Sequence, residues 1–145
     1  MKLLNLKEVT ISELSLALSN HQVKNEIDDD GDIILYRDGN HAILKIDEDK
    51  IKFFGISEFQ PKHNIENLTA FIEKINYIGE ELRFTIMDAD KDKGVKLFFS
   101  SAFIKNGFID EVFLSSTINL CFDELERLIA LFPSMVDIMN EKKGL

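Results

Sequence analysis

Residues 95–120 read VKLFFSSAFIKNGFIDEVFLSSTINL, two apolar-rich segments joined by Asn106-Gly107. Asn-Gly suits a two-residue type I′ turn, in which both central residues need positive φ, and the flanking β-branched and aromatic residues strengthen a hairpin signal. In the resulting register Phe99 faces Leu114, and Val95 faces Ile118. The pattern predicts a hairpin of Val95–Lys105 and Phe108–Leu120 at the centre of the fold.

The two faces of this predicted hairpin differ in polarity, because successive side chains of a strand alternate between faces. One face is apolar and is the predicted core: Val95, Leu97, Phe99, Phe103, Val112, Leu114 and Ile118. The other mixes apolar residues, among them Phe98 and Phe113, with lysine, serine and glutamate. Phe98 and Phe113 lie diagonally across the predicted hairpin, within reach of each other.

The first half of the chain predicts one helix and a β-meander. Thr10-Ile-Ser-Glu13 has capping-box spacing, so a helix is expected from Thr10 to about Asn20. Asp-Gly and Glu-Asp pairs then mark turns. They separate four predicted strands, Val23–Asp28, Asp32–Arg37, His41–Asp47 and Lys50 to about Ile56.

The second half predicts two more helices around the hairpin. Asn64 caps a helix that runs to about Tyr77, and Leu82–Met87 is a strand. The last helix has apolar residues at helical spacing, which are Phe122, Leu125, Ile129, Phe132, Val136 and Met139. Pro133 is expected to kink it, because proline lacks the N–H that would bond four residues back.

These elements predict an α+β fold in the order α-ββββ-α-βββ-α, an antiparallel sheet of meanders with an N-terminal, a middle and a long C-terminal helix. With 145 residues, 45% of them hydrophobic, the chain has the size of one domain, so we predict a single domain over residues 1–145. The formal charge of −9 repels phosphate, which argues against nucleic acid and anionic membranes as partners. A single cysteine and the absence of a long apolar run in residues 1–8 predict a cytoplasmic protein.

Two segments carry a resemblance to a known family. With DDDGDIILYRDG at residues 28–39 and VFLSSTINLCFDELERLIALF at residues 112–132, and with this order of elements, the chain resembles the YbjN family. That family is described as bacterial sensory-transduction regulators with a type III secretion chaperone-like fold. The resemblance covers roughly residues 10–140 and implies a non-enzymatic module that binds protein and is often dimeric. Asn106-Gly107 and Pro133 depart from the family pattern.

Two acidic loops resemble the calcium-binding loop of an EF-hand in part of their spacing. An EF-hand loop needs carboxylates at positions 1, 3 and 5, glycine at 6 and a glutamate at 12. In a loop starting at Glu26, Asp28 and Asp30 occupy positions 3 and 5 and Gly31 position 6, but position 12 is Arg37. Asp88, Asp90 and Asp92 are followed by Lys93 where glycine is required. Both loops are interpreted as solvated turns, and we predict no metal site and no cofactor.

The lone cysteine is a candidate for nucleophilic catalysis. Cys121 could in principle pair with His21, His41 or His63, but no nucleophile elbow, glycine-rich oxyanion turn or orienting carboxylate accompanies any of them. A lone cysteine is usually a small buried hydrophobe. The sequence therefore predicts no catalytic residues and a protein that is not an enzyme.

The predicted function is protein binding or regulation of the YbjN type, through a homodimer or a protein partner. The terminal helix carries more apolar residues than one covered side requires, and the outer hairpin face adds two rings. The candidate interface residues are Phe98, Phe113, Leu128, Leu131, Met135 and Ile138. The alternative is an acidic immunity or antitoxin-like protein whose −9 charge attracts a basic toxin such as a nuclease.

Overall fold

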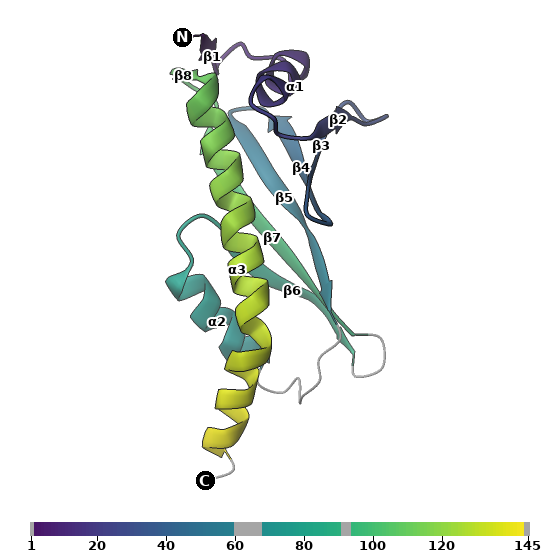
Figure 1. The fold of residues 1–145 in the computed structure, drawn as a ribbon, viewed down its shortest axis with the longest axis vertical. Coiled ribbons are helices and arrows are strands. Elements are labelled where there is room, and N and C mark those ends of the chain that lie inside the picture. The colour runs from purple at the N-terminus through teal and green to yellow at the C-terminus, as the bar shows by residue number, and fades with distance from the viewer. Residues whose placement is uncertain (1, 60–67, 91–93, 144–145) are drawn as a thin grey trace. The chain divides into compact units, whose positions relative to one another are not determined.

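A computed structural model describes the backbone of residues 2–59, 68–90 and 94–143, and the side chains of residues 2–58, 68–89 and 94–131. The elements are arranged as Figure 1 labels them. In chain order they are β1 (Leu3–Asn5), α1 (Ile11–Asn20), β2 (Asn25–Ile27), β3 (Ile33–Arg37), β4 (Asn40–Asp47), β5 (Lys50–Phe59), α2 (Leu68–Ile78), β6 (Arg83–Asp90), β7 (Gly94–Ile104), β8 (Phe108–Asp110) and α3 (Glu111–Lys143).

The chain divides into two compact units. Unit 1 comprises Met1–Gly55 and Ser100–Phe122, and unit 2 comprises Ile56–Phe99 and Asp123–Leu145. Three elements, β5, β7 and α3, contribute residues to both units. The strand order in the main sheet is β2-β3-β4-β5-β7-β6, and β1 and β8 form a separate two-stranded sheet.

The predicted first helix is confirmed, with the cap that its sequence indicates. The Thr10 hydroxyl accepts a hydrogen bond from the Glu13 N–H at 3.1 Å, which satisfies one of the donors that a helix start leaves open. Leu14, Ala17 and Leu18 are buried on one side of α1. This apolar stripe fixes which side of the helix meets the sheet.

The predicted meander is also confirmed, and its turns use the expected chemistry. Asp38 and Gly39 both have positive φ, 49° and 82°, as a two-residue type I′ turn requires. At the preceding turn the Asp28 carboxylate accepts from the N–H groups of Asp30 and Asp32, both at 2.9 Å. β2–β3, β3–β4 and β4–β5 pair antiparallel in one continuous register.

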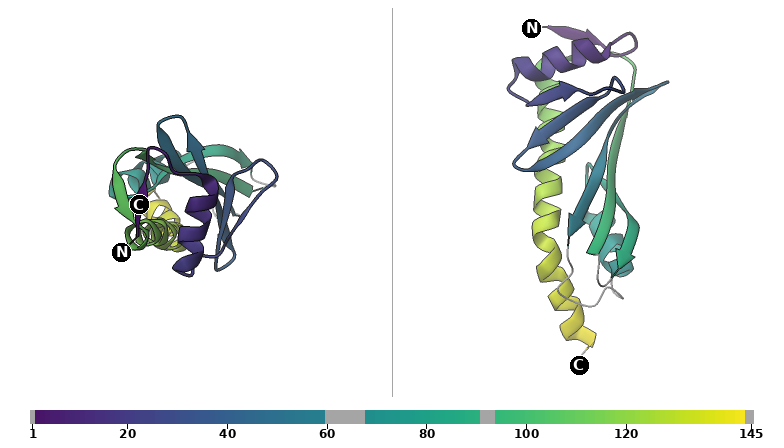
Figure 2. Two further views of the ribbon diagram at one scale, coloured as in Figure 1. Left: turned by 90° about the horizontal axis from the view of Figure 1, so that it is seen from above. Right: turned by 90° about the vertical axis from the view of Figure 1, so that its right-hand side faces the viewer.

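One face of the unit 1 strands is the core. Ile33, Leu35, Leu44 and Phe53 are fully buried on this inner face. The Phe53 ring meets the Phe122 ring of α3 edge-on, with centroids 5.3 Å apart. In Figure 2, right, α1 and the part of α3 up to Phe122 lie on the same side of β3, β4 and β5. The helices of unit 1 therefore cover one face of these strands.

Unit 2 packs α2 against β6. Leu68, Phe71, Ile72 and Ile75 are the buried residues of α2. The Asn76 side chain bonds both backbone groups of Phe84, accepting from its N–H at 2.7 Å and donating to its carbonyl at 2.9 Å. The Asn76 amide thus makes the pair of backbone hydrogen bonds that a neighbouring strand would make to Phe84 of β6. The start predicted for this helix, at Asn64, lies outside the described residues.

The predicted hairpin is wrong after Asn106-Gly107. Gly107 has φ 85°, but Asn106 is not among the residues with positive φ, so the turn is not type I′. β8 is only three residues long and pairs with β1, a strand the sequence did not predict. From Glu111 onward the chain is helix, so the predicted pairing of Phe99 with Leu114 does not form.

The physical reason for this correction is a helix cap. The Asp110 carboxylate accepts a hydrogen bond from the Phe113 N–H at 2.6 Å. Asp110 therefore acts as the N-cap of α3, whose side chain typically bonds the N–H three residues later. Leu114, Ile118, Cys121, Phe122 and Leu125 are then buried at helical spacing. Val112, expected in the core, is 58% exposed. The α+β class and the order of helices are as predicted. None of the described helices is both long and apolar enough to cross a membrane.

Candidate functional site

The outer face of β3, β4 and β5, opposite α1 and α3, carries side chains in rows across the strands. Tyr36 faces His41 directly, and in the next row Ile34 faces Ile43, which faces Phe54. A further row holds Lys45 opposite Lys52. Ile34, Ile43 and Phe54 are half-buried, although they lie on the face that no helix of unit 1 covers.

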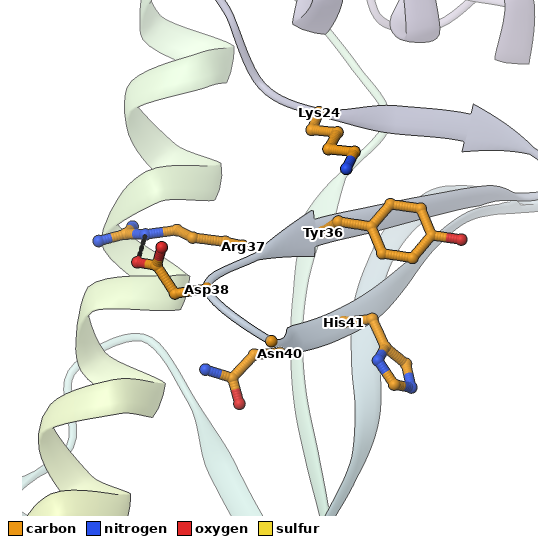
Figure 3. A pocket seen from close by; sticks show the side chains of 7 residues that line it. Lys24, Tyr36, Arg37, Asp38, Asn40 and His41 are labelled. Atoms are coloured by element: carbon orange, nitrogen blue, oxygen red, sulfur yellow. Dashed lines mark ion pairs between the residues drawn. The ribbon is translucent and has the colours of Figure 1, made fainter.

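A shallow pocket of about 290 Å³ opens at the β3–β4 turn. Figure 3 shows its side chains, which belong to Lys24, Tyr36, Arg37, Asp38, Asn40 and His41, with Gly39 completing the wall. The Lys24 ammonium lies 5.8 Å from the centre of the Tyr36 ring, a cation–π distance. The Tyr36 and His41 rings are 6.4 Å apart and tilted by 51°.

Arg37 lines the pocket but points away from this aromatic pair, toward α3 (Figure 3). It donates a hydrogen bond to the Asn119 carbonyl at 2.9 Å, and its guanidinium carbon lies 5.9 Å from the centre of the Phe122 ring. These contacts tie the turn to α3. Lys24 and His41 are therefore the basic side chains of the pocket that do not point toward α3.

Two of the carboxylates on the outer face, Glu26 and Asp47, contact neighbouring side chains. The Tyr36 hydroxyl donates to Glu26, and this hydrogen bond raises the pKa of Tyr36 above its usual 10.0. Asp47 lies 2.7 Å from the Lys52 ammonium. The Lys52 hydrogen bond, assisted by the charges of Lys52, Lys45 and Lys50, lowers the pKa of Asp47 below 3.8. Lysines and carboxylates thus alternate on the outer face, where Asp32 continues the row of Lys45 and Lys52.

A second surface, the β8–α3 patch, consists of exposed apolar side chains around the start of α3. Leu3 and Phe108 lie on one face of the β1–β8 pair, because Leu3 faces Asp110 and Asn5 faces Phe108. Val112 and Phe113 follow in the first turn of α3, and Ile104 ends β7. The five side chains are 58–71% exposed. Figure 1 shows β1 and β8 beside each other at this end of α3.

Glu124 is a buried carboxylate that the sequence did not single out. Its side chain accepts from three consecutive backbone N–H groups, those of Glu80, Glu81 and Leu82, at 2.5, 2.7 and 2.8 Å. The residue is only 2% exposed. It therefore fastens α3 to the α2–β6 connection inside unit 2.

Glu111 is a second buried carboxylate, in the first turn of α3. One oxygen lies 3.4 Å from His21 Nε2 and accepts from the Asn20 amide at 3.3 Å, and the other lies 3.7 Å from the Lys2 ammonium. This cluster ties the N-terminal segment and the end of α1 to α3 in unit 1. The His21–Glu111 contact was not predicted, because nothing in their sequence separation links them.

Two of the residues considered as candidates for metal or nucleophilic chemistry have structural roles in the described part of the chain. The Asp28 carboxylate is engaged by its own turn, and Cys121 is a buried side chain of α3. His63 and Asp92 lie outside the described residues. Within the described ranges, no three His, Cys, Asp or Glu side chains are grouped so that they could hold a metal ion.

The predicted interface residues lie in β7 and α3, because the hairpin that was expected to carry Phe98 and Phe113 does not form. Phe113 is exposed in the β8–α3 patch, whereas Phe98 is a half-buried residue of β7. Leu128 is buried and Leu131 is 40% exposed, both in α3. The side chains of Met135, Ile138 and Pro133 lie outside the described residues, so the predicted kink does too. Leu3, Ile104 and Phe108 are patch residues that the prediction missed.

Comparison with solved structures shows what this fold is similar to. The crystal structure of YbjN, a proposed transcription regulator from E. coli, matches with a TM-score of 0.64 over 83% of this chain and 89% of that chain, at 15% identity. The crystal structure of an uncharacterized protein from Methanothermobacter thermautotrophicus matches with a TM-score of 0.62 over 88% and 99%, at 14% identity. The chain has a YbjN-like fold, as its resemblance implied. No family model and no curated protein matches the sequence.

Proposed function

We propose that this protein is a non-enzymatic protein-binding module of the YbjN type that forms a homodimer through the β8–α3 patch. The observation that carries the proposal is the exposure of Leu3, Ile104, Phe108, Val112 and Phe113 around one helix start. Apolar side chains gathered on a surface usually mark an interaction site. A twofold axis lets the same patch serve both copies, and about 800 Å² per partner would make a standard interface.

Charge is compatible with self-association at this position. Two copies of a chain of net charge −9 repel each other, so a dimer interface should lie where the local charge is balanced. Lys2 and Lys105 lie beside the patch in sequence, and Asp110 and Glu111 offset them. The proposed regulatory role follows the description of YbjN and would act through protein contact.

The role without catalysis is supported by how the buried carboxylates are used. Glu124 is bonded to three backbone N–H groups, and Glu111 contacts Lys2, Asn20 and His21. Both are engaged in holding the fold together, and neither lines the described pocket.

The test is the mass in solution of Phe108→Ser with Phe113→Ser, measured by light scattering after gel filtration. The wild type should have twice the chain mass of 16.6 kDa, and the double variant should have 16.6 kDa with an unchanged thermal transition. Tyr77→Ser with Met87→Ser is the matched control, since these side chains are 90% and 54% exposed in unit 2. A monomeric wild type, or a control that dissociates equally, would refute the proposed dimer.

The acidic charge favours a second candidate, an immunity or antitoxin-like protein for a basic toxin such as a nuclease. A −9 chain attracts a basic partner and accelerates association at low salt. A toxin reading frame immediately upstream of the coding sequence, whose product binds this chain with an affinity that falls steeply with salt, would support it. A neighbourhood with no such reading frame would favour the first proposal.

A further inference from the structure

Two hydrogen bonds at the ends of the β1–β8 pair show which way its backbone groups point. The Leu6 N–H donates to the Gly107 carbonyl at 2.9 Å. At the other end the Glu111 N–H donates to the Lys2 carbonyl at 3.3 Å. Both bonds continue the register of the ladder, in which hydrogen-bonded pairs alternate with pairs that exchange no hydrogen bond. Counting inward from either end, Ile109 is the residue of β8 whose backbone groups point toward β1.

The other two residues of β8, Phe108 and Asp110, turn their backbone groups away from β1. Within the described ranges no strand pairs with β8 on that side, because β1 and β8 form a two-stranded sheet by themselves. Figure 1 shows β8 on the outer side of β1. The outer edge of β8 is therefore open, and an open strand edge is a template for a further strand.

We propose that β8 pairs antiparallel with β8 of a second copy, so that the dimer contains a four-stranded sheet in the order β1-β8-β8-β1. The twofold axis passes beside Ile109, and each copy's Asp110 N–H donates to the Phe108 carbonyl of the other copy. The two Phe108 rings are then diagonal neighbours on one face, a separation that aromatic side chains bridge. The inference rests on the proposed dimer and specifies how the β8–α3 patch is used.

The length and the charge of β8 favour a second copy over a strand of another protein. β8 has only three residues, so its edge holds a partner at two positions, and an identical strand related by a twofold axis matches both. Lys105 precedes β8 and Asp110 ends it, so antiparallel pairing places the basic end of each strand beside the acidic end of the other. Exposed Leu3 and Phe108 lie on one face of the β1–β8 pair, and this face continues into the second copy.

The backbone also selects the register. A pairing centred on Phe108 would need strand geometry at Gly107, whose φ of 85° lies outside the β region. A pairing centred on Asp110 would place two aspartates opposite each other, where like charges repel. Centring on Ile109 uses all three residues of β8 and avoids both costs.

The first test is a disulfide across the axis. In the proposed register the two Ile109 residues exchange no hydrogen bond, so their Cα atoms lie about 4.5 Å apart, within the range of about 4.4–6.8 Å that a disulfide spans. Ile109→Cys, made in a Cys121→Ala chain and treated with oxidised glutathione, should run at twice the chain mass of 16.6 kDa on a non-reducing gel. Leu3→Cys in the same background is the matched control, because the two Leu3 residues would be three strand spacings apart, at least about 14 Å.

The second measurement uses the wild type. Hydrogen exchange followed by NMR should show the Asp110 N–H exchanging at least tenfold more slowly above the dissociation constant of the dimer than below it. The Ile109 N–H points toward β1 of its own copy, so its exchange should not depend on concentration, and it is the internal control.

The outcomes separate the pairing of β8 from the dimer itself. If the wild type is a dimer by light scattering but Ile109→Cys crosslinks no better than Leu3→Cys, the β8 pairing is overturned and the proposed dimer stands. An Asp110 N–H that exchanges equally fast at every concentration has the same meaning, and it would leave the edge open to a strand of another protein. A monomeric wild type would refute the dimer and the pairing together.

Discussion

Glu124 lies in the middle of α3, and three backbone N–H groups of the α2–β6 connection depend on its carboxylate. Glutamine has the same size but only one acceptor oxygen, and its NH₂ group would face N–H donors. Because a buried donor without an acceptor costs about 1–3 kcal/mol, Glu124→Gln should lower the free energy of unfolding by about 2 kcal/mol or more. Urea denaturation followed by circular dichroism measures this loss.

The matched control for Glu124→Gln is Glu73→Gln, the same substitution at an exposed position of α2. A surface change of this kind usually stays within about 0.5 kcal/mol. If the two variants lost equal stability, the three hydrogen bonds would contribute nothing beyond the removal of a charge.

The ion pair of Asp47 with Lys52 can be tested through the titration of Asp47. Lys52 holds the pKa of Asp47 below 3.8 by a hydrogen bond and by its charge, so Lys52→Gln should raise the pKa of Asp47 toward 3.8. NMR titration of the side-chain carboxyl carbon measures it. Lys96→Gln, which removes a lysine paired with Glu58 in unit 2, is the control and should leave the pKa of Asp47 unchanged.

The sign of the linked stability follows from the same shift. A carboxyl group whose pKa is lower in the folded state stabilises that state above the unfolded pKa, and this contribution is lost as pH falls through the folded pKa. The wild type should therefore exceed Asp47→Asn in stability above pH 3.8, and the difference should vanish in more acidic solution. A difference that grows as pH falls would contradict the assignment.

Contacts of single side chains were the least predictable part of the fold. Glu124 and Glu111 are charged residues in an apolar helix pattern, and sequence reasoning assigns such residues to a solvated face. The partners of Glu124 are backbone N–H groups about 40 positions away, and those of Glu111 include a side chain about 90 positions away. Contacts over such separations leave no local pattern in the sequence. The Thr10 cap was predictable because donor and acceptor are three residues apart.

Asp38-Gly39 and Asn106-Gly107 show that a turn dipeptide predicts a hairpin correctly in one place and wrongly in another. Asp38-Gly39 forms the predicted turn, because both flanking segments continue as strands with alternating burial. Asn106-Gly107 has the better turn residues, yet Asp110 caps a helix three residues later. The burial of Leu114 and Ile118 fits both the alternation of a strand and the spacing of a helix. The burial of Ser115 and Cys121 and the exposure of Val112 fit only a helix.

The Asp38-Gly39 turn gives a prediction for the β3–β4 hairpin. A Cβ at Gly39 would meet nothing within 4 Å, so the cost of a side chain there is conformational. At φ 82°, Gly39→Ala should cost about 1–2 kcal/mol. Gly39→Asn should cost less, because asparagine tolerates positive φ. Equal losses in thermal unfolding for the two variants would mean that the turn changes its backbone conformation.

At the scale of the whole chain, the sequence predicted the class of fold but gave no sign of the division into two compact units. Periodicity and turn residues predicted three helices around a meander, which the YbjN-like fold confirms. The prediction of a single domain over residues 1–145 is a statement about cooperativity, whereas the division into two units describes where contacts concentrate. Only an unfolding experiment decides between one folding unit and two.

We expect one cooperative transition. α3 is a continuous helix through Phe122–Asp123, where the units divide, and β5 and β7 also contribute to both. Unfolding one unit would break the hydrogen-bond ladders of these three elements midway, and helix formation is cooperative along a continuous helix. Each unit alone is also smaller than about 80 residues, a size at which one core rarely suffices.

The experiment compares Leu14→Ala in unit 1 with Leu82→Ala in unit 2, both at fully buried positions. Each removes core contacts and should cost about 2–5 kcal/mol. Hydrogen exchange in increasing urea, read by mass spectrometry on peptides from both units, should show all peptides losing protection at one midpoint. That midpoint should fall in either variant, because a loss in one unit is then a loss for the whole chain. If Leu14→Ala shifted only the peptides of residues 2–55 and 100–122, the chain would be two domains sharing three elements.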